Sequence, residues 1–225
     1  MEMLKRFMKQ MSSSLPLNLI NGYAAWKKRG YPERRALLQR LVKEGQHPTT
    51  MIISCCDSRV DPTTIFNSEF GEFFIHRNIA NLVPPFSLEG DQNGTSAAIE
   101  YAVTALKVAH IVILGHSNCG GVQGCFNMCT GKAPELEKST SFVGRWINTL
   151  RPGFERLGSS GSDEEKILLL EKEGIAISLE NLLTFPFVVQ AMENGNLCLH
   201  GLWHDIANGV LFALEGGSFK PVVIE

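Results

Sequence analysis

Two short clusters carry the residues best suited to chemistry in this chain of 225 residues. The first is Cys55–Arg59, of sequence CCDSR, which follows the apolar run Thr49–Ser54. The second is His116–Gly121, of sequence HSNCGG, which follows the apolar run Ile111–Gly115. Apolar runs of this length predict buried strands, and ligands bind at the carboxyl ends of strands in open α/β sheets. We therefore expect the two clusters to meet at one site.

A zinc ion is the partner that these donors suit best. Cysteine sulfur and histidine nitrogen are usual zinc ligands, in tetrahedral sets of four. His116 and Cys119 are close enough in sequence to hold one ion from a single turn, and Cys55 would reach it from the neighbouring strand end. Three protein ligands leave the fourth position open, as in catalytic zinc sites. A His-x-x-Cys pair alone is a weak signal, but its combination with Cys-x-Asp-Ser-Arg at a second strand end is a strong one.

The surrounding pattern predicts an α/β fold with a mostly parallel central sheet of about four to five strands flanked by helices. Strands are expected over residues 50–55, 73–76, 111–115, 197–202 and 210–214. The chain is expected to be a single domain, 1–225, in which residues 1–45 form an N-terminal helical arm. Within this arm, Gly30 is expected to end one helix and Pro32 to begin the next.

Composition argues against several classes of protein. A net charge of −2 gives no reason to expect nucleic acid or an anionic membrane as a partner. No apolar run approaches the ~20 residues that span a bilayer, and no signal-peptide core follows the basic segment 1–9, so a cytoplasmic location is expected. Six cysteines without a secretory signal indicate metal ligands or reactive thiols rather than disulfides.

The two clusters resemble the zinc motifs of the β-class carbonic anhydrases, in the same order along the chain. The resemblance covers roughly residues 46–214 and extends through the segments 77–81 (RNIAN), 97–103 (AAIEYAV) and 199–201 (LHG). It implies that Cys55, His116 and Cys119 hold one zinc ion per subunit. It also implies that Asp57 and Arg59 form the catalytic dyad, and that the reaction is the reversible hydration of carbon dioxide to bicarbonate and a proton.

The resemblance further implies a substrate pocket and an oligomer. Gln46, Phe74 and Tyr101 match the residues that line this pocket in the open, plant-like variant of the family, and Gly120 is assigned to the same pocket. In the bicarbonate-regulated variant the aspartate can occupy the fourth zinc position, and a tryptophan stands where this chain has Ile52. Because the family builds the pocket across a dimer interface, we expect a homodimer or a dimer-based higher homo-oligomer, with the N-terminal helices packing on the partner subunit.

The residues themselves fit this reaction. Zinc lowers the pKa of bound water and so supplies hydroxide near neutral pH. Ionised Asp57 can only accept hydrogen bonds, so it can take the hydrogen of zinc-bound hydroxide and orient the oxygen, while Arg59 keeps Asp57 charged. Two thiolates and a neutral imidazole cancel the charge of the ion. This predicts a bound water less acidic than that of a three-histidine site, and activity that rises through alkaline pH.

Three other functions use the same residues. Zinc-dependent hydrolysis of carbon disulfide or carbonyl sulfide, which some members of this family perform, is compatible with the sequence. A cysteine hydrolase could use Cys55 or Cys119 with His116, but no third group is evident to orient the histidine. A non-catalytic zinc-stabilised protein would need neither Asp57 nor Arg59.

Cys56 stands where the family has serine, directly after the first candidate ligand. Strand alternation points Cys55 and Cys56 to opposite faces, so Cys56 is expected to be buried and to take no part in metal binding. Buried structural roles are also expected for the remaining thiols and one histidine, namely Cys125, Cys129, Cys198 and His200.

Overall fold

The computed structural model of this chain describes residues 2, 3, 5, 15–88 and 94–224. The chain divides into two compact units, Met1–Gln46 and His47–Glu225. Most of the basic segment 1–9, together with residues 10–14 of the expected arm, lies outside the described residues.

The first unit is helical from Leu17 to Glu44. Helix α2 (Leu17–Ala25) continues through a π-helical turn, η1 (Trp26–Gly30), into α3 (Tyr31–Glu44). The expectation that Gly30 ends a helix is wrong, because Gly30 has helical angles of φ −69° and ψ −40°. The widened π turn ends two residues before Pro32, whose missing N–H cannot complete regular helical pairing. No residue of these three elements is buried.

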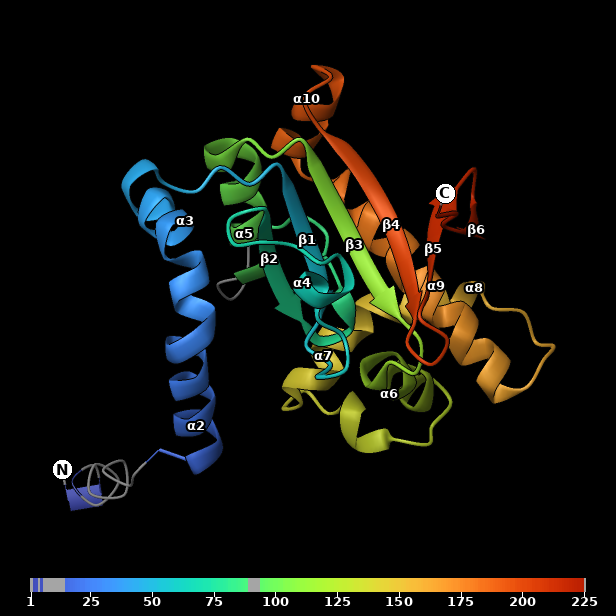
Figure 1. The fold of residues 1–225 in the computed structure, drawn as a ribbon. Helices are drawn as coiled ribbons and strands as arrows, with labels where there is room; N and C mark the ends of the chain where they lie inside the picture. Colours follow the sequence, from blue (N-terminus) through green and yellow to red (C-terminus); the bar gives the residue numbers. More distant parts are fainter. Residues whose placement is uncertain (1, 4, 6–14, 89–93, 225) are drawn as a thin grey trace. The chain divides into compact units, whose positions relative to one another are not determined.

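The second unit is built on a six-stranded sheet in the order β2-β1-β3-β4-β5-β6 (Figure 1). Its strands are β1 (Thr50–Cys55), β2 (Phe73–Asn78), β3 (His110–His116), β4 (Cys198–Asp205), β5 (Val210–Glu215) and β6 (Ser218–Pro221). The first four are parallel and the last two antiparallel. The expected α/β fold with a mostly parallel sheet is confirmed. The sheet has one strand more than expected, because Gly216 and Gly217 adopt positive φ angles and turn the chain back into β6.

Helices and helical turns connect these strands. They are α4 (Pro62–Ile65), η2 (Ile79–Asn81), α5 (Gly94–Glu100), η3 (Tyr101–Leu106), α6 (Gly120–Cys129), η4 (Pro134–Glu137), α7 (Phe142–Ile147), η5 (Asn148–Leu150), α8 (Arg151–Arg156), α9 (Asp163–Leu182) and α10 (Pro186–Glu193). Within the described ranges, no single helix is long and apolar enough to cross a membrane, and α9 and α10 meet that test only as a pair bent by 85°.

The two faces of the sheet are covered unequally. Ile111 and Ile113 point into the larger core, which α5, η3, α9 and α10 close from one side. Val112 and Leu114 alternate to the other face, where a smaller cluster includes Ile65 of α4. Figure 1 shows α9 running along one side of the sheet behind β4 and β5, with only the short α4 in front. Helices therefore cover one face of the sheet with a full core, whereas a smaller cluster with the short α4 covers the other face.

Close packing of α9 on the sheet depends on two glycines. A Cβ atom at Gly115 in β3 would lie 2.7 Å from Ile175 Cδ1, and one at Gly201 in β4 would lie 2.8 Å from Ile175 Cγ2. Real Cβ atoms do not approach so closely, so a larger residue requires Ile175 or the helix that carries it to shift. Because β3 ends in His116, this contact helps to fix the strand end that carries the second cluster.

We expect Gly115→Ala to lower the free energy of unfolding by roughly 1–3 kcal/mol, because the new methyl group overlaps Ile175 Cδ1. Ile175→Val removes that atom, so the double variant should lose less stability than the sum of the two single variants. Urea denaturation followed by circular dichroism measures each step. Gly124→Ala is the control, since its Cβ would lie 3.4 Å from Ile147 Cδ1 and should be tolerated. A Gly115→Ala protein as stable as the parent would contradict this packing argument.

Candidate metal centre

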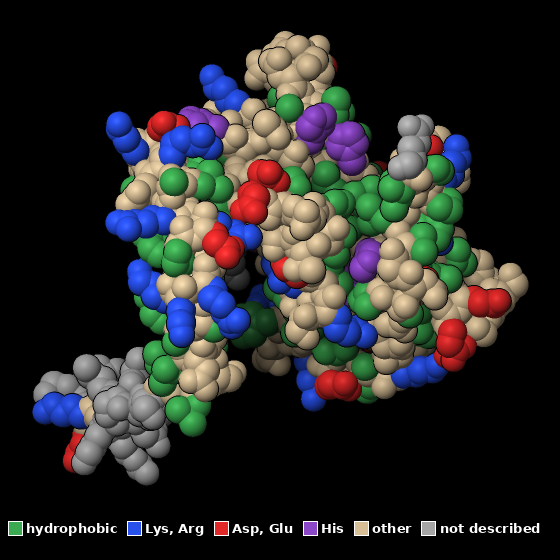
Figure 2. All heavy atoms as spheres, in the orientation of Figure 1, with side chains coloured by type: hydrophobic (Ala, Val, Ile, Leu, Met, Phe, Trp, Pro, Cys, Tyr) green, Lys and Arg blue, Asp and Glu red, His purple; other side chains and the backbone are tan. Residues whose placement is uncertain are grey.

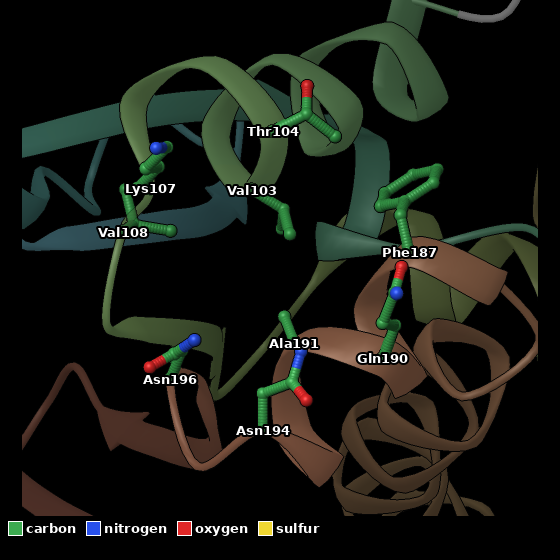
Figure 3. Close-up of a pocket in the computed structure, with 9 residues that line it drawn as sticks. All are labelled: Val103, Thr104, Lys107, Val108, Phe187, Gln190, Ala191, Asn194 and Asn196. Carbon is green, nitrogen blue, oxygen red and sulfur yellow. The ribbon is translucent and has the colours of Figure 1, made fainter.

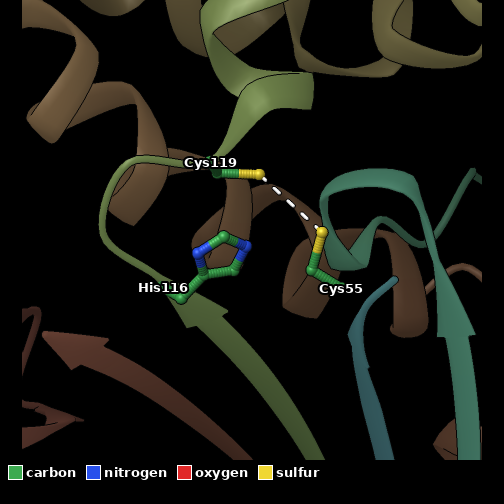
Figure 4. Close-up of side chains that lie close together, drawn as sticks. All are labelled: Cys55, His116 and Cys119. Carbon is green, nitrogen blue, oxygen red and sulfur yellow. Dashed lines mark hydrogen bonds between the residues drawn. The ribbon is translucent and has the colours of Figure 1, made fainter. Parts of the chain in front are cut away.

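The carboxyl ends of β1 and β3 bring together the three residues proposed as metal ligands. The ligand atoms of Cys55, His116 and Cys119 all lie within 4.8 Å of one another, and all three side chains are buried (Figure 4). The two sulfur atoms are 3.9 Å apart. Sulfurs that share one tetrahedral zinc ion, each at about 2.3 Å from it, would be about 3.8 Å apart. The spacing therefore fits a single ion.

His116 has the tautomer and orientation of a metal ligand. Its Nδ1 lies 2.9 Å from the Ser117 carbonyl oxygen, to which it donates its proton, so Nε2 carries the free lone pair. Nε2 is buried and has no hydrogen-bond partner. A buried acceptor without a partner is costly, and a metal ion at this point would satisfy it. Figure 4 shows the ring lying beside the two sulfur atoms, at the end of β3.

Backbone groups favour negative charge on both sulfurs. The Ala80 N–H lies 3.4 Å from Cys55 Sγ, and this approach uses an unusual left-handed conformation of Ala80, with φ 62°. Cys119 is the N-cap of α6, where the amides of Gly121 and Val122 act to lower the pKa of its thiol. These donors prepare the sulfurs to act as thiolate ligands.

The two thiols cannot both ionise in the absence of a cation. A hydrogen bond from Cys119 is the largest cause that lowers the pKa of Cys55, and burial opposes it. Cys119, which keeps the shared proton, has a pKa raised by Cys55 first and by burial second. Burial also acts to lower the pKa of His116, but the adjacent Cys55, the Ser117 carbonyl oxygen and the nearby negative charges raise it overall. A divalent cation would offset the repulsion between two adjacent thiolates, so the donor set fits a metal.

Asp57 and Arg59 form a rigid ion pair directly after β1. Arg59 donates from Nε to Asp57 Oδ1 at 2.9 Å and from Nη2 to Oδ2 at 2.7 Å, and its backbone N–H donates to Oδ1 at 3.0 Å. Nη2 also donates to the Asn118 carbonyl oxygen at 3.0 Å, which ties the pair to the second cluster. The Arg59 hydrogen bond is the largest cause that holds the pKa of Asp57 well below its usual range. Asp57 is therefore ionised at all physiological pH values.

Arg77, at the carboxyl end of β2, holds the loop that carries this pair. It donates to the carbonyl oxygens of Cys55 at 2.8 Å, Asp57 at 2.8 Å and Val60 at 2.6 Å. Three carbonyl groups bonded to one guanidinium fix the path of the chain after β1. The segment 77–81 noted in the sequence therefore has a positioning role in this structure.

Glu171 is a buried residue of the site that the sequence analysis did not identify. Its carboxylate, on α9, accepts hydrogen bonds from the Cys119 backbone N–H at 3.1 Å and from Trp203 Nε1 at 3.2 Å. Burial raises its pKa, while these two donors oppose the rise. No sequence signal marks it, because α9 reads as an ordinary helix and Glu171 reaches Cys119 only through the fold.

The expected pocket residues do not all lie beside this cluster. Gly120 directly follows Cys119 and is exposed at the start of α6. Phe74 pairs with Met51 in the sheet, so it lies about 13 Å along the strands from Cys55. Its ring packs on Tyr101 at 5.8 Å between centroids. Gln46 is the last residue of the first unit.

Three burial expectations are wrong. Cys56 is exposed, because β1 ends at Cys55 and nothing described covers the loop beyond it. Cys198 and His200 are exposed as well, since they lie on the thinly covered face at the start of β4. Cys125 is buried as expected, and Cys129 is partly buried. Alternation along a strand predicts which face a side chain takes, but not whether that face is covered.

A cavity of about 500 Å³ lies away from the metal cluster, between η3 and α10 (Figure 3). Its lining combines amide side chains with one lysine and several apolar groups, namely Val103, Thr104, Lys107, Val108, Phe187, Gln190, Ala191, Asn194 and Asn196. None of these is a thiol, an imidazole or a carboxylate. This cavity therefore offers no usual zinc ligand, whereas Cys55, His116 and Cys119 lie together elsewhere.

Comparison with known proteins gives a consistent result. A family model described as carbonic anhydrase matches residues 50–211. Beta carbonic anhydrase 3 of Arabidopsis thaliana is 36% identical over 203 residues, which cover 89% of this chain and 76% of the relative. The structure of the β-carbonic anhydrase CcaA superposes with a TM-score of 0.79 at 31% identity and covers 92% of each chain. One of two tetrameric β-carbonic anhydrases from the ascomycete Sordaria macrospora gives a TM-score of 0.74 at 29% identity, covering 90% of this chain and 97% of the other.

We expect Glu171→Gln to weaken zinc binding roughly 10–100-fold, because an amide offers only one acceptor oxygen to the two donors that Glu171 now serves. Competition with a zinc chelator measures the affinity. Glu173→Gln, on the same helix and in an ion pair with Arg156, is the matched control. Equal affinities in the two variants would show that Glu171 does not support the site.

Proposed function

This chain belongs to the β-carbonic anhydrase family, and we propose that it catalyses the reversible hydration of carbon dioxide to bicarbonate and a proton, a lyase reaction, at a zinc ion held by Cys55, His116 and Cys119. The observation that carries this proposal is the buried two-sulfur, one-imidazole cluster with an ionised carboxylate tied to its edge. Zinc in such a site lowers the pKa of bound water and supplies a nucleophile near neutral pH.

Asp57 is the residue that orients the attacking oxygen. Each carboxylate oxygen can accept about two hydrogen bonds. Oδ1 already accepts two from Arg59, whereas Oδ2 accepts one. The remaining acceptor position of Oδ2 is therefore available for the hydrogen of the attacking water. Arg59 keeps this carboxylate ionised and fixed in direction, so an oxygen lone pair rather than a hydrogen faces carbon dioxide.

The same ion pair favours the open, plant-like form of the site. Asp57 could become a metal ligand only by giving up contacts with Arg59, which is itself anchored on the Asn118 carbonyl oxygen. Losing a bidentate, charge-assisted pair is unfavourable. We therefore assign the fourth metal position to water and substrate, in agreement with Ile52 in place of the tryptophan of the regulated form.

The hydrophobic part of the pocket requires a second subunit. Phe74 and Tyr101 pack on one another too far along β1 to serve the Cys55 of their own chain, and Tyr101 is 49% exposed. In a homodimer these rings and Gln46 would complete the partner's pocket, and the exposed apolar residues of α2 would pack on the partner. The tetrameric assembly named for the Sordaria macrospora relatives supports an oligomer built from such dimers.

We expect rapid, zinc-dependent hydration of carbon dioxide in a stopped-flow assay, lost on chelation and restored by zinc. Asp57→Asn should lower kcat roughly 10²–10⁴-fold, because a neutral amide is a weaker hydrogen-bond acceptor than a carboxylate and is no longer held in place by the charge of Arg59. Asp61→Asn is the matched control, since Asp61 caps α4 and asparagine caps helices as well. Full zinc content with no hydration would shift the assignment to hydrolysis of carbon disulfide or carbonyl sulfide. Zinc-independent thiol chemistry would instead indicate a cysteine hydrolase.

The pH profile tests the charge of the ligand set. Two thiolates offset the charge of the ion, so the pKa that governs activity should lie between about 7, as in three-histidine sites, and about 9, as in aqueous zinc. The active form is deprotonated, so kcat should rise with pH through this window. Asp57 should add no step near neutral pH, because Arg59 holds its pKa far below this range. A profile already flat below pH 7 would contradict the two-thiolate assignment.

A further inference from the structure

Two histidines meet at the amino ends of the central strands, at the opposite end of β3 from the proposed active site. His110 Nδ1 lies 3.1 Å from His200 Nε2, and the ring centroids are 5.2 Å apart. His110 begins β3, about 20 Å along the strand from His116. The pair lies on the thinly covered face of the sheet, where His200 is exposed and His110 is partly exposed. Figure 2 shows histidine side chains at the surface beside hydrophobic ones.

A thiol stands next to this pair. Cys198 is the register partner of His110 across the β3–β4 ladder, and it precedes His200 by two residues. Residues at this spacing share one face of a strand, so all three side chains project to the same side. Cys198 is exposed and not part of a disulfide. Two imidazoles and one thiol are thus presented together at the surface.

Both histidines are suited to bind a metal in their neutral forms. Burial first, and then the charge of His110, lower the pKa of His200. No ion pair joins either histidine to a carboxylate in the part of the chain that the structure describes. A neutral imidazole offers a lone pair, and adjacent imidazoles resist joint protonation.

We propose that His110 Nδ1, His200 Nε2 and Cys198 Sγ form a second site for a divalent cation of zinc-like character, with water completing the tetrahedron. Two nitrogens that share a tetrahedral zinc ion, each at about 2.0–2.1 Å, are about 3.3 Å apart, close to the separation seen here. Binding replaces the proton that the two rings share and the proton of the Cys198 thiol. Cys198 joins by rotation about its Cα–Cβ bond, since the three donor atoms do not yet lie within 4.8 Å of one another.

This site is independent of the proposed hydration reaction. It would tie the starting residues of β3 and β4 together, whereas the active site uses the other end of β3. A cation that binds only the folded chain stabilises it in proportion to its occupancy. The site should therefore raise the thermal stability of the holoenzyme without entering catalysis.

The test is a zinc titration of holoenzyme that already carries one zinc ion per subunit, by equilibrium dialysis with elemental analysis. We expect a second equivalent in the parent protein and its loss in both His110→Ala and His200→Ala, with carbon dioxide hydration unchanged. His47→Ala, which removes an exposed histidine elsewhere, should keep the second equivalent. The second equivalent should also raise the Tm of the parent and not that of the His200→Ala protein.

Cobalt identifies the thiol ligand. Co²⁺ added to the zinc holoenzyme should produce a near-ultraviolet thiolate-to-cobalt absorption band that Cys198→Ser abolishes. No second equivalent in the parent, or a second equivalent that both histidine variants retain, would overturn the proposal. In that case the two histidines are simply a hydrogen-bonded surface pair. Because these side chains are at the surface, circular dichroism should confirm that each variant is folded.

Discussion

The site depends on keeping two sulfur atoms 3.9 Å apart in a buried position, together with an imidazole nitrogen that has no other partner. In the absence of a cation this arrangement is unfavourable, because only one thiol can ionise and one acceptor stays unsatisfied. A backbone N–H group lies close to Cys55 Sγ, and the Ser117 carbonyl oxygen fixes the orientation of the imidazole. Metal binding would therefore stabilise both thiolates and satisfy the unpaired imidazole nitrogen together.

Much of the surrounding fold can be understood as support for that geometry. Cys55 and His116 are fixed by the ends of adjacent parallel strands, and Cys119 by the first turn of α6. Arg77 binds three carbonyl groups of the loop after β1, and Glu171 holds the backbone of Cys119 from α9. The glycines that let α9 approach the sheet therefore act on the site as well, because Glu171 reaches Cys119 only if the helix packs closely. Contacts from β2 and α9 thus support ligands that lie at two strand ends and at the start of one helix.

The sequence predicted the features that neighbouring residues determine. It did not predict burial or contacts that depend on how distant elements pack. The clusters at 55–59 and 116–121 each combine a strand with its ligands, so the fold class and the cluster of donors follow from short stretches. Glu171 belongs to the site through a contact between residues 52 positions apart, and no periodicity reports it. Cys56 and Cys198 were expected to be buried, because a pattern of side chains does not state what lies over a sheet face. Gly30 was expected to end a helix, but a π turn accommodates the proline that follows.

Exposed apolar side chains link the proposed oligomer to the chemistry. Tyr101 is exposed, and α2 of the first unit has no buried residue and exposes Leu17, Leu19, Ile20 and Tyr23. Association with a partner subunit would remove these apolar side chains from water. Phe74 and Tyr101 are too far from their own cluster to serve it, so the same association that covers these surfaces would also supply the apolar wall that carbon dioxide needs. A subunit that cannot pair would then keep its metal ligands and lose its substrate pocket. Such a subunit would bind the metal but would not be active.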